Sequence, residues 1–185
     1  MSMVSPHLVL PVSVRDHIAG PATAPATLLE YGDYECPFCG AAHPIVQQVR
    51  KQLGNRLRFV FRHFPLANIH PRAEPAAEAA EAAGAQGRFW EMHDLLYERQ
   101  DALEEEDLVE RAEILGLDVA RFVRELSERT HAPRVREDFL SGVRSGVNGT
   151  PAFYINGIRH DGGFDFPTLV EAIELAMETR HRGAV

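Results

Sequence analysis

The stretch Leu28–Cys39, LLEYGDYECPFC, decides the fold, because it contains both cysteines of the chain and spaces them as C-x-x-C. The run ATLLEY at 26–31 is short and rich in strand-forming residues, and it lies between Pro25 and Gly32. A run of this kind predicts a β-strand that ends a few residues before the first cysteine.

The residues after the cysteines predict a helix that ends near Gly54. If this helix begins at the cysteines, Pro37 lies in its first turn, where a missing N–H is harmless and a fixed φ is favourable. Cys36 then occupies the cap of the helix. Apolar side chains recur along it at four-residue spacing: Ile45, Val49 and Leu53.

This position suits Cys36 to act as the attacking sulfur, because the N–H groups and the positive dipole end of a helix terminus stabilise a thiolate. Asp33 and Glu35 oppose this effect. An exposed carboxylate about 7 Å away in water contributes only about 0.6 kcal/mol, whereas a partly buried helix terminus contributes up to about 2 kcal/mol. Cys39, one turn further in, is expected to be shielded and to resolve disulfides formed at Cys36.

A C-x-x-C pair is also compatible with half of a zinc site, and His43, four residues after Cys39, is a candidate third ligand. No second C-x-x-C and no H-x-x-x-H is present in the sequence to complete such a site. The strand-to-helix context also disfavours two incidental core cysteines. We therefore expect no metal, and no cofactor other than a redox-active Cys36–Cys39 disulfide.

The composition sets bounds on size and partners. With 185 residues and 45% hydrophobic content, the chain can bury a full core as one compact unit with an insertion. The net charge is −8 and no basic stripe is present, so we expect no nucleic-acid partner. No apolar run approaches the roughly eighteen residues that span a bilayer, so we expect no membrane partner.

The N-terminal segment MSMVSPHLVLPVSVRD makes a poor signal peptide. No positive charge precedes its short apolar patch, and Pro6 and Pro11 interrupt it. We therefore expect a cytoplasmic protein, unless an export signal has been removed.

Elsewhere the sequence predicts strands near both ends of the chain and helices between them. HLVLPVSV at 7–14 alternates weakly and predicts an edge strand, whereas LRFVFRHFPL at 57–66 predicts a buried second strand. A strand, helix, strand order implies a parallel pair. Five helices are predicted within 67–146: Arg72–Ala85, Phe89–Arg99, Glu104–Leu115, Asp118–Glu128 and Pro133–Ser145.

The last part of the chain returns to strands. AFYI and IRH flank Asn156-Gly157, which is a strong signal for a two-residue hairpin turn. Asp165 and Pro167 then open a last helix. The predicted order is strand, helix, strand, a helical block, two strands and a helix.

This order, the C-x-x-C at the first strand-to-helix junction and a Thr-Pro before the third strand resemble the thioredoxin fold. The helical block resembles the DsbA-type branch of the thiol-disulfide oxidoreductases, in particular its small single-chain bacterial members. The phrases EYGDYECPFC, HFPL, QGRFWEMHDLLY and GVNGTPAFYINGIRHDG carry the resemblance over roughly residues 15–180.

The resemblance implies an α/β protein with a thioredoxin-like mixed sheet and an inserted helical domain. The implied division is an N-terminal extension at 1–25 with a possible edge strand, a thioredoxin-like domain at 26–66 and 147–180, and a helical insertion at 67–146.

Carried over residue by residue, the resemblance implies that Cys36 is the nucleophile and Cys39 the resolving thiol. It also implies that Thr150-Pro151 forms a loop with a cis peptide bond, which faces the pair and contacts substrate. From the residues alone, an ordinary trans proline at a strand start would be favoured.

Glu30 lies six residues before Cys36, where similar proteins keep a buried acid below the disulfide. It interrupts an otherwise apolar strand, so we expect it to be buried, and burial favours the neutral form of a carboxylic acid. Such an acid can accept the proton of Cys39 when that thiol attacks. The alternative is a solvated strand edge with no part in the mechanism.

Two features depart from the family pattern. The dipeptide between the cysteines is Pro37-Phe38, which we expect to contact substrate, and strong oxidants of the family have a histidine where Phe38 stands. Without that partner the thiolate is stabilised less, and we expect a lower reduction potential. The second departure is the poor export signal, so the direction of electron flow stays open.

Three hypotheses follow from the resemblance. The first is an enzyme that exchanges disulfides with protein or peptide substrates as reductase, oxidase or isomerase, with thioredoxin or glutathione as a redox partner. The second is a non-catalytic peptide-binding or chaperone-like module. The third is a glutathione-dependent transferase or isomerase of the same fold.

Overall fold

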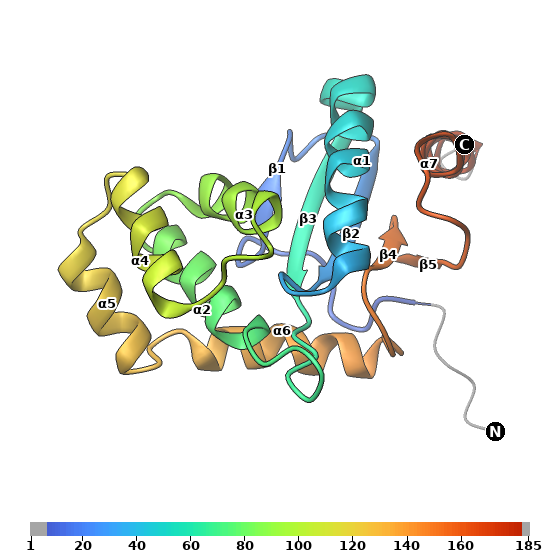
Figure 1. Ribbon diagram of the computed structural model, residues 1–185. Helices are drawn as coiled ribbons and strands as arrows, with labels where there is room; N and C mark the ends of the chain where they lie inside the picture. The colour runs from blue at the N-terminus through green and yellow to red at the C-terminus, as the bar shows by residue number, and fades with distance from the viewer. Residues whose placement is uncertain (1–6, 183–185) are drawn as a thin grey trace. The chain divides into compact units, whose positions relative to one another are not determined.

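The computed structural model describes residues 7–182, which form a five-stranded mixed sheet and seven α-helices (Figure 1). The fold class is α/β, as predicted. In sheet order the strands are β1 (His17–Ala19), β3 (Leu57–His63), β2 (Ala26–Gly32), β4 (Ala152–Ile155) and β5 (Ile158–His160). The helices are α1 (Pro37–Leu53), α2 (Ala73–Gly84), α3 (Phe89–Glu98), α4 (Glu105–Ile114), α5 (Val119–Ser127), α6 (Ala132–Arg144) and α7 (Phe166–Arg182).

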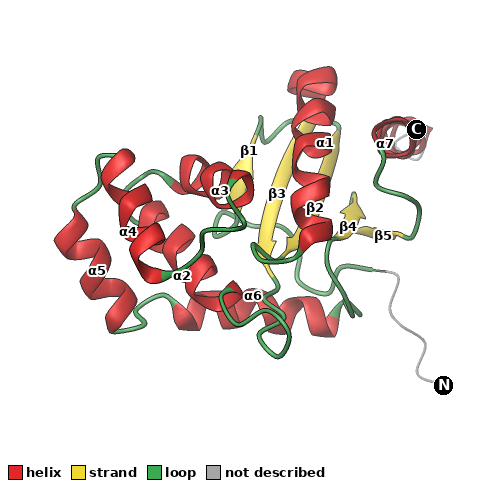
Figure 2. Cartoon of the chain, in the orientation of Figure 1, coloured by secondary structure: helices red, strands yellow, loops and turns green. Residues whose placement is uncertain are grey.

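The predicted helices between the second and third predicted strands all form, and each of their ends lies within one residue of its predicted position. Figure 2 shows these helices following one another with only short loops between them. The hairpin turn at Asn156-Gly157 also forms between β4 and β5. Helical periodicity and turn residues were therefore sufficient to locate these elements.

The chain forms two compact units. The sheet unit comprises the residues up to Tyr31, Ala41–Arg62 and the residues from Ser141 onward, and the helical unit comprises Gly32–Gly40 and His63–Leu140. The turn with both cysteines thus belongs to the helical unit, whereas the predicted division placed it with the sheet. Whether the predicted domain bounds also delimit units that fold independently stays a prediction.

β2 is the centre of the sheet unit, because every one of its residues is buried. Its antiparallel register with β4 places Leu28 opposite Ile155, and the rings of Tyr31 and Tyr154 meet edge to face at 5.9 Å. α1 lies along the sheet (Figure 1), where the Arg50 guanidinium lies 5.4 Å from the centre of the Phe59 ring.

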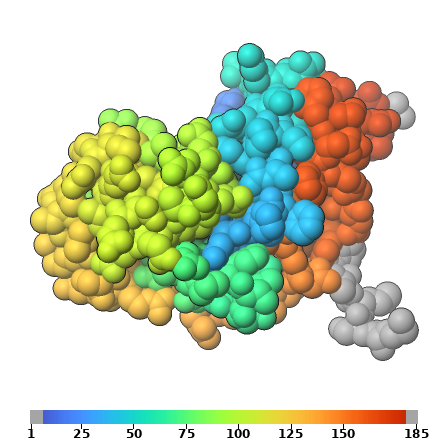
Figure 3. All heavy atoms as spheres, in the orientation of Figure 1, coloured from blue at the N-terminus to red at the C-terminus, as the bar shows by residue number. Residues whose placement is uncertain are grey.

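α2 is the centre of the helical unit. It packs against α3, α4 and α5, and Figure 3 shows the atoms of α3 to α5 forming a closely packed surface. The alanine-rich sequence of α2 is therefore a packed helix, because small side chains let neighbouring helices approach. Its buried alanines are Ala73, Ala76, Ala77, Ala79, Ala80, Ala82 and Ala83.

The expectation of an edge strand at 7–14 is wrong. Only an isolated bridge between His7 and Ile158 lies in that segment, and Pro11 has no N–H with which to extend a ladder. The edge strand is β1, which pairs antiparallel with β3.

The second predicted strand is also shorter than expected, since β3 ends at His63 rather than at residue 66. Pro65 has no N–H, and the N–H of Leu66 donates to the Asp33 carboxylate at 2.9 Å instead of to a strand. Backbone pairing thus stops at Pro65, and the next N–H is taken by a side chain near the cysteines.

Candidate active site

The first turn of α1 carries the cysteine pair. The helix begins at Pro37, so Cys36 occupies its cap, as the sequence predicted. The Cys36 carbonyl accepts a helical hydrogen bond from the N–H of Gly40 at 3.1 Å. The positive end of the helix dipole therefore lies at Cys36 and favours negative charge on its sulfur.

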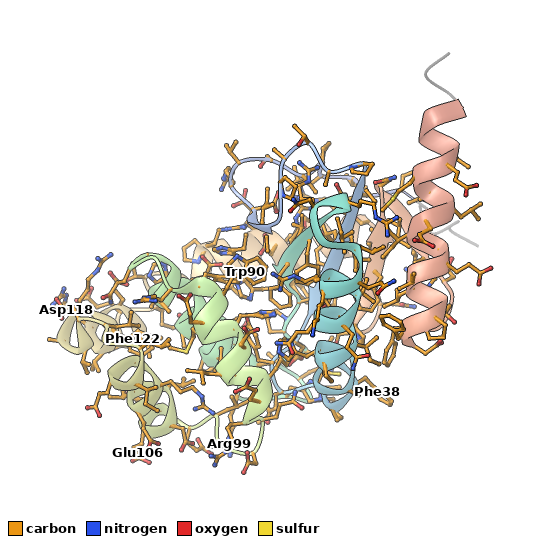
Figure 4. The ribbon with its side chains drawn as sticks, turned by 90° about the horizontal axis from the view of Figure 1, so that it is seen from above. Phe38, Trp90, Arg99, Glu106, Asp118 and Phe122 are labelled. Atoms are coloured by element: carbon orange, nitrogen blue, oxygen red, sulfur yellow. The ribbon has the colours of Figure 1, made fainter. Side chains whose placement is uncertain are left out.

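Both cysteines are buried. An attacking sulfur is expected to be accessible, but Cys36 is only 3% exposed. Cys39 is fully enclosed, so Cys36 is the less enclosed of the two. Phe38, which lies between them, is 64% exposed and points away from α1 (Figure 4). The motif thus presents an apolar ring to the solvent beside two sheltered sulfurs.

Asp33 organises the turn that leads to Cys36. Its Oδ1 accepts the N–H of Glu35 at 2.8 Å and that of Cys36 at 3.2 Å. Its Oδ2 accepts the N–H of Leu66 at 2.9 Å and lies 2.8 Å from Nδ1 of His70. The treatment of Asp33 as an exposed carboxylate is therefore wrong: it is buried and joins the cysteine turn to the loop after β3.

Glu35 also differs from the exposed, isolated charge that the sequence suggested. Its carboxylate accepts the backbone N–H of Arg72 at 2.6 Å and lies 3.6 Å from the Arg72 guanidinium. Arg72 is shared with Glu104, which it contacts as well. The positive charge of Arg72 reduces the repulsion that Glu35 would exert on a thiolate at Cys36.

Gln100 holds the other side of the same turn. Its Nε2 donates to the carbonyl of Tyr34 at 2.8 Å and to that of Cys36 at 2.9 Å. A Cβ added to Gly40 would overlap the side-chain amide of Gln100. The glycine that follows Cys39 therefore leaves room for this contact.

Tyr34 is fixed by its side chain as well. The hydroxyl group lies 2.9 Å from Nδ1 of His93, and the ring centre lies 4.8 Å from that of Tyr97. All three residues are buried in the helical unit. The segment before Cys36 is thus anchored through both its backbone and an aromatic side chain.

Three of the predicted site residues lie in the sheet unit. Glu30 is 2% exposed in β2, opposite Phe153, so the alternative of a solvated strand edge is wrong. The Thr150–Pro151 peptide bond is cis, and both residues are half-buried directly before β4. The roles expected for these residues towards the cysteines stay predictions.

Sequence reasoning did not find Gln100, and it misjudged Asp33. Asp33 carried a usable signal, because an aspartate in a turn commonly accepts the N–H groups that lie two and three residues after it. Gln100 carried no such signal, since its contacts join parts of the chain that are far apart in sequence.

Comparison with known proteins identifies the family. A model of the family described as Thioredoxin matches residues 13–175. The chain is 49% identical over 170 residues to a Na(+)/H(+) antiporter NhaA 1 of Salinispora arenicola, with 91% of this chain and 26% of that protein covered. It is 43% identical to a Na(+)/H(+) antiporter NhaA of Herminiimonas arsenicoxydans, with 86% and 25% covered. The chain thus spans about a quarter of the length of the curated relatives it matches.

Solved structures confirm the expected fold, a thioredoxin-like core with inserted helices. BdbD from Bacillus subtilis matches with a TM-score of 0.82 at 24% identity, with 95% of this chain and 98% of that chain covered. A thioredoxin-like oxidoreductase from Silicibacter pomeroyi matches with a TM-score of 0.77 at 25% identity, with 90% and 94% covered. The α-DsbA1 protein of Wolbachia pipientis matches with a TM-score of 0.79 at 20% identity, with 96% and 98% covered.

The expectation of a cytoplasmic protein is wrong. The sequence relatives are antiporters, which are membrane proteins, and the chain matches a segment of each of them. The weak N-terminal signal that suggested the cytoplasm therefore gave no information about location.

Between residues 7 and 182, no helix is both long and apolar enough to cross a membrane.

Proposed function

Because this chain belongs to the thioredoxin family, we propose that it is a DsbA-type thiol-disulfide oxidoreductase that exchanges disulfides with protein substrates through Cys36 and Cys39. The observation that carries the proposal is the C-x-x-C pair at the start of α1, with Cys36 at the helix cap. The similarity to a thioredoxin-like oxidoreductase supports redox chemistry. The proposal concerns the region that the chain shares with its longer relatives.

In the reducing direction, the Cys36 thiolate attacks one sulfur of a substrate disulfide. A mixed disulfide forms, and the other substrate sulfur leaves as a thiolate and takes up a proton from water. The Cys39 thiol then loses its proton and attacks Cys36. The second substrate sulfur leaves, a Cys36–Cys39 disulfide forms, and two electrons have passed to the substrate. Oxidation of a substrate dithiol is the reverse sequence.

The reduction potential of the Cys36–Cys39 couple assigns the direction. Phe38 provides no charge and no hydrogen bond to a thiolate, so we expect a lower potential than that of family members with histidine at this position. Equilibration of the chain with glutathione buffers measures the potential. A value near the cytosolic glutathione poise or below it supports a reductase, and a value well above it supports an oxidase.

Insulin reduction tests the assignment of the two sulfurs. Cys36→Ser is expected to abolish activity, whereas Cys39→Ser is expected to accumulate mixed disulfides through Cys36, which mass spectrometry detects. Faster alkylation of Cys39 than of Cys36 at neutral pH would reverse the roles.

The same variants separate the enzyme from the other two hypotheses. A chaperone-like module predicts that a chain without cysteines suppresses aggregation as well as the natural chain, with no insulin reduction by either. A glutathione-dependent enzyme predicts glutathione binding without any dithiol cycle.

We also propose that Glu30 accepts the proton of Cys39, directly or through a water, when that thiol attacks. Its burial within β2 supports this role, because a buried carboxylic acid can exchange protons closer to neutral pH. Glu30→Gln keeps the shape and removes the titration. It is expected to slow release of substrate from Cys36 and to leave the first attack nearly unchanged in stopped-flow measurements. Unchanged pH profiles for both steps would exclude Glu30 from the mechanism.

A further inference from the structure

We infer that Gln100 is a positioning residue for disulfide exchange at Cys36, an inference that rests on the proposed function and deepens it. Gln100 lies in the loop after α3, and its side chain is half-buried. A primary amide has two N–H donors, and two carbonyls accept from Gln100, those of Tyr34 and Cys36. Both donors are thus directed at the backbone beside the attacking sulfur.

The first consequence is electrostatic. The Cys36 carbonyl has a partial negative charge and lies within the same residue as the sulfur, so it disfavours a thiolate there. Gln100 at 2.9 Å and the N–H of Gly40 at 3.1 Å both donate to this carbonyl and offset part of that charge. Gln100 therefore favours the thiolate without touching the sulfur.

The second consequence is geometric. Asp33 accepts the N–H groups of Glu35 and Cys36, while Gln100 donates to the carbonyls of Tyr34 and Cys36. The anionic Asp33 thus accepts from N–H groups of the turn, and the neutral Gln100 amide donates to its carbonyls. A turn held in this way keeps Cys36 at the helix cap before and after exchange, and such preorganisation lowers the reorganisation that the reaction requires.

Gly40 provides independent support for a close approach by Gln100. A glycine within a helix is less favourable than alanine by about 1 kcal/mol. At this position a Cβ would overlap both the oxygen and the carbon of the Gln100 amide. Glycine at this position therefore lowers the stability of the helix but leaves room for the Gln100 amide.

The test uses Gln100→Glu in the full chain. Glutamate keeps the length of the side chain but places an oxygen, which repels the two carbonyls, where the donor nitrogen stood. The reduced protein is alkylated with iodoacetamide at a series of pH values, and peptide mapping reports Cys36 alone. We expect alkylation at neutral pH to fall about threefold to tenfold, in line with the net contribution of one hydrogen bond.

The pH of half-maximal alkylation is expected to rise, and the reduction potential is expected to fall, because the reduced form loses thiolate stabilisation. Gln100→Glu also adds a negative charge, which by itself disfavours the thiolate. Both shifts are therefore assigned to the lost hydrogen bonds only if Gly40→Ala, which adds no charge, moves both quantities in the same direction. Arg99→Ala is the matched control, because Arg99 is the neighbouring residue and its exposed side chain pairs with Asp101 at the surface (Figure 4). It is expected to leave both readouts unchanged.

Gly40→Ala is the second variant, and it decides the question if Gln100→Glu does not fold. The added methyl group displaces the Gln100 amide without changing its chemistry, so we expect shifts of the same sign and smaller size. Wild-type pH profiles and potentials in the folded variants would overturn the role of Gln100. If the natural chain itself shows no dithiol cycle with insulin, the proposed function fails instead, whatever the variants do.

Discussion

Asp33 in the helical unit and Arg62 in the sheet unit carry opposite charges, but both bind backbone groups of the chain from a buried position. Each is a buried charged side chain, 1% exposed, that gathers backbone groups from distant segments. Asp33 accepts N–H groups from the cysteine turn and from the loop after β3. Arg62 donates to the carbonyls of Leu10 and Pro11 at 2.8 and 3.1 Å.

The two sites differ in how their charge is balanced. Arg62 forms a two-pronged ion pair with the Asp16 carboxylate at 2.7 and 3.1 Å and also donates to the Tyr31 hydroxyl at 3.1 Å. Burial alone would lower the pKa of Arg62, but these partners outweigh it and raise the pKa above its ordinary value. Arg62 therefore stays charged and fastens the N-terminal segment to the sheet.

The side chain of Asp33 instead contacts three backbone N–H groups and one histidine, His70. The charge of that histidine depends on its protonation. The comparison indicates that the two sites have different roles. The Arg62 site fastens the N-terminal segment to the sheet, whereas the Asp33 site holds the turn that leads to Cys36. Substitutions should therefore separate stability from exchange chemistry.

The largest expected effect is that of Arg62→Met. This substitution leaves the Asp16 carboxylate buried without its cation, so we expect the free energy of unfolding to fall by about 3–5 kcal/mol. Urea denaturation followed by far-UV circular dichroism measures the loss. Fluorescence of Trp90, the single tryptophan, follows the helical unit in the same experiment, because Trp90 lies in α3.

Alkylation of Cys36 in the folded fraction of Arg62→Met is expected to match that of the natural chain. Arg56→Ala is the control for arginine loss in the same unit, because its ion pair with Glu174 is half exposed and is worth at most about 1 kcal/mol. An equally small loss in Arg62→Met would show that the buried ion pair does not stabilise the sheet unit.

The next effect is that of Asp33→Asn. The amide of asparagine offers only one acceptor, so its NH2 group must face either the Leu66 N–H or the N–H groups of the cysteine turn. We expect a loss of about 1–3 kcal/mol in unfolding free energy, the cost of leaving one buried donor unpaired. Unlike Arg62→Met, this variant is also expected to alter the pH profile of Cys36 alkylation.

Glu35→Gln is the control for charge at this turn, because Glu35 carries a similar charge but is tied to Arg72 near the surface. It is expected to change stability by less than about 1 kcal/mol. If the two variants had the same effect on alkylation, Asp33 would act through its charge alone and not through the hydrogen bonds of the turn.

The contrast between these two sites also shows what the sequence could and could not predict. Helical periodicity, the Asn156-Gly157 turn and the cysteine spacing act locally, so they located the helices, the hairpin and the helix cap at Cys36. The expected burial of Glu30 followed from the family resemblance and in part from the apolar strand pattern, and it is confirmed. These features depend on neighbours along the chain.

The burial of Asp33 and the contact of Gln100 depend on segments that only folding brings together. From the sequence alone, a charged residue before the cysteines is expected to be a solvated loop residue, because its backbone partners are not known. The edge strand was misplaced for a related reason, since the weak alternation at 7–14 competed with Pro11, and pairing with β3 selected His17–Ala19 instead. Non-local hydrogen bonding therefore determined the parts that sequence patterns missed.

A smaller effect is expected for Asp118→Ala, which tests the stability of the helical unit without a buried charge. The Asp118 side chain accepts the N–H of Arg121 at 2.9 Å and caps α5. Loss of such a cap costs about 1 kcal/mol, and the Trp90 transition in urea should report it. Asp118→Asn retains the acceptor and is expected to restore most of the loss, whereas equal losses would exclude the cap as the cause.

The smallest expected effect is a change in how steeply the free energy of unfolding depends on pH, and it concerns Asp138 on α6. Burial raises the pKa of this carboxyl group above its usual value, although the nearby His63 and Arg134 act in the opposite direction. Between the ordinary pKa and the raised one, the folded chain holds a proton that the unfolded chain has lost, so the free energy of unfolding falls as the pH rises through that window. Asp138→Asn removes this titration, so the stability of the natural chain relative to the variant should decline with rising pH in urea denaturation series. A constant difference across the window would mean that Arg134, with which Asp138 is in contact, keeps the carboxylate charged at all pH values tested. Asp138 would then resemble the Arg62 site, where an ion pair sets the charge state.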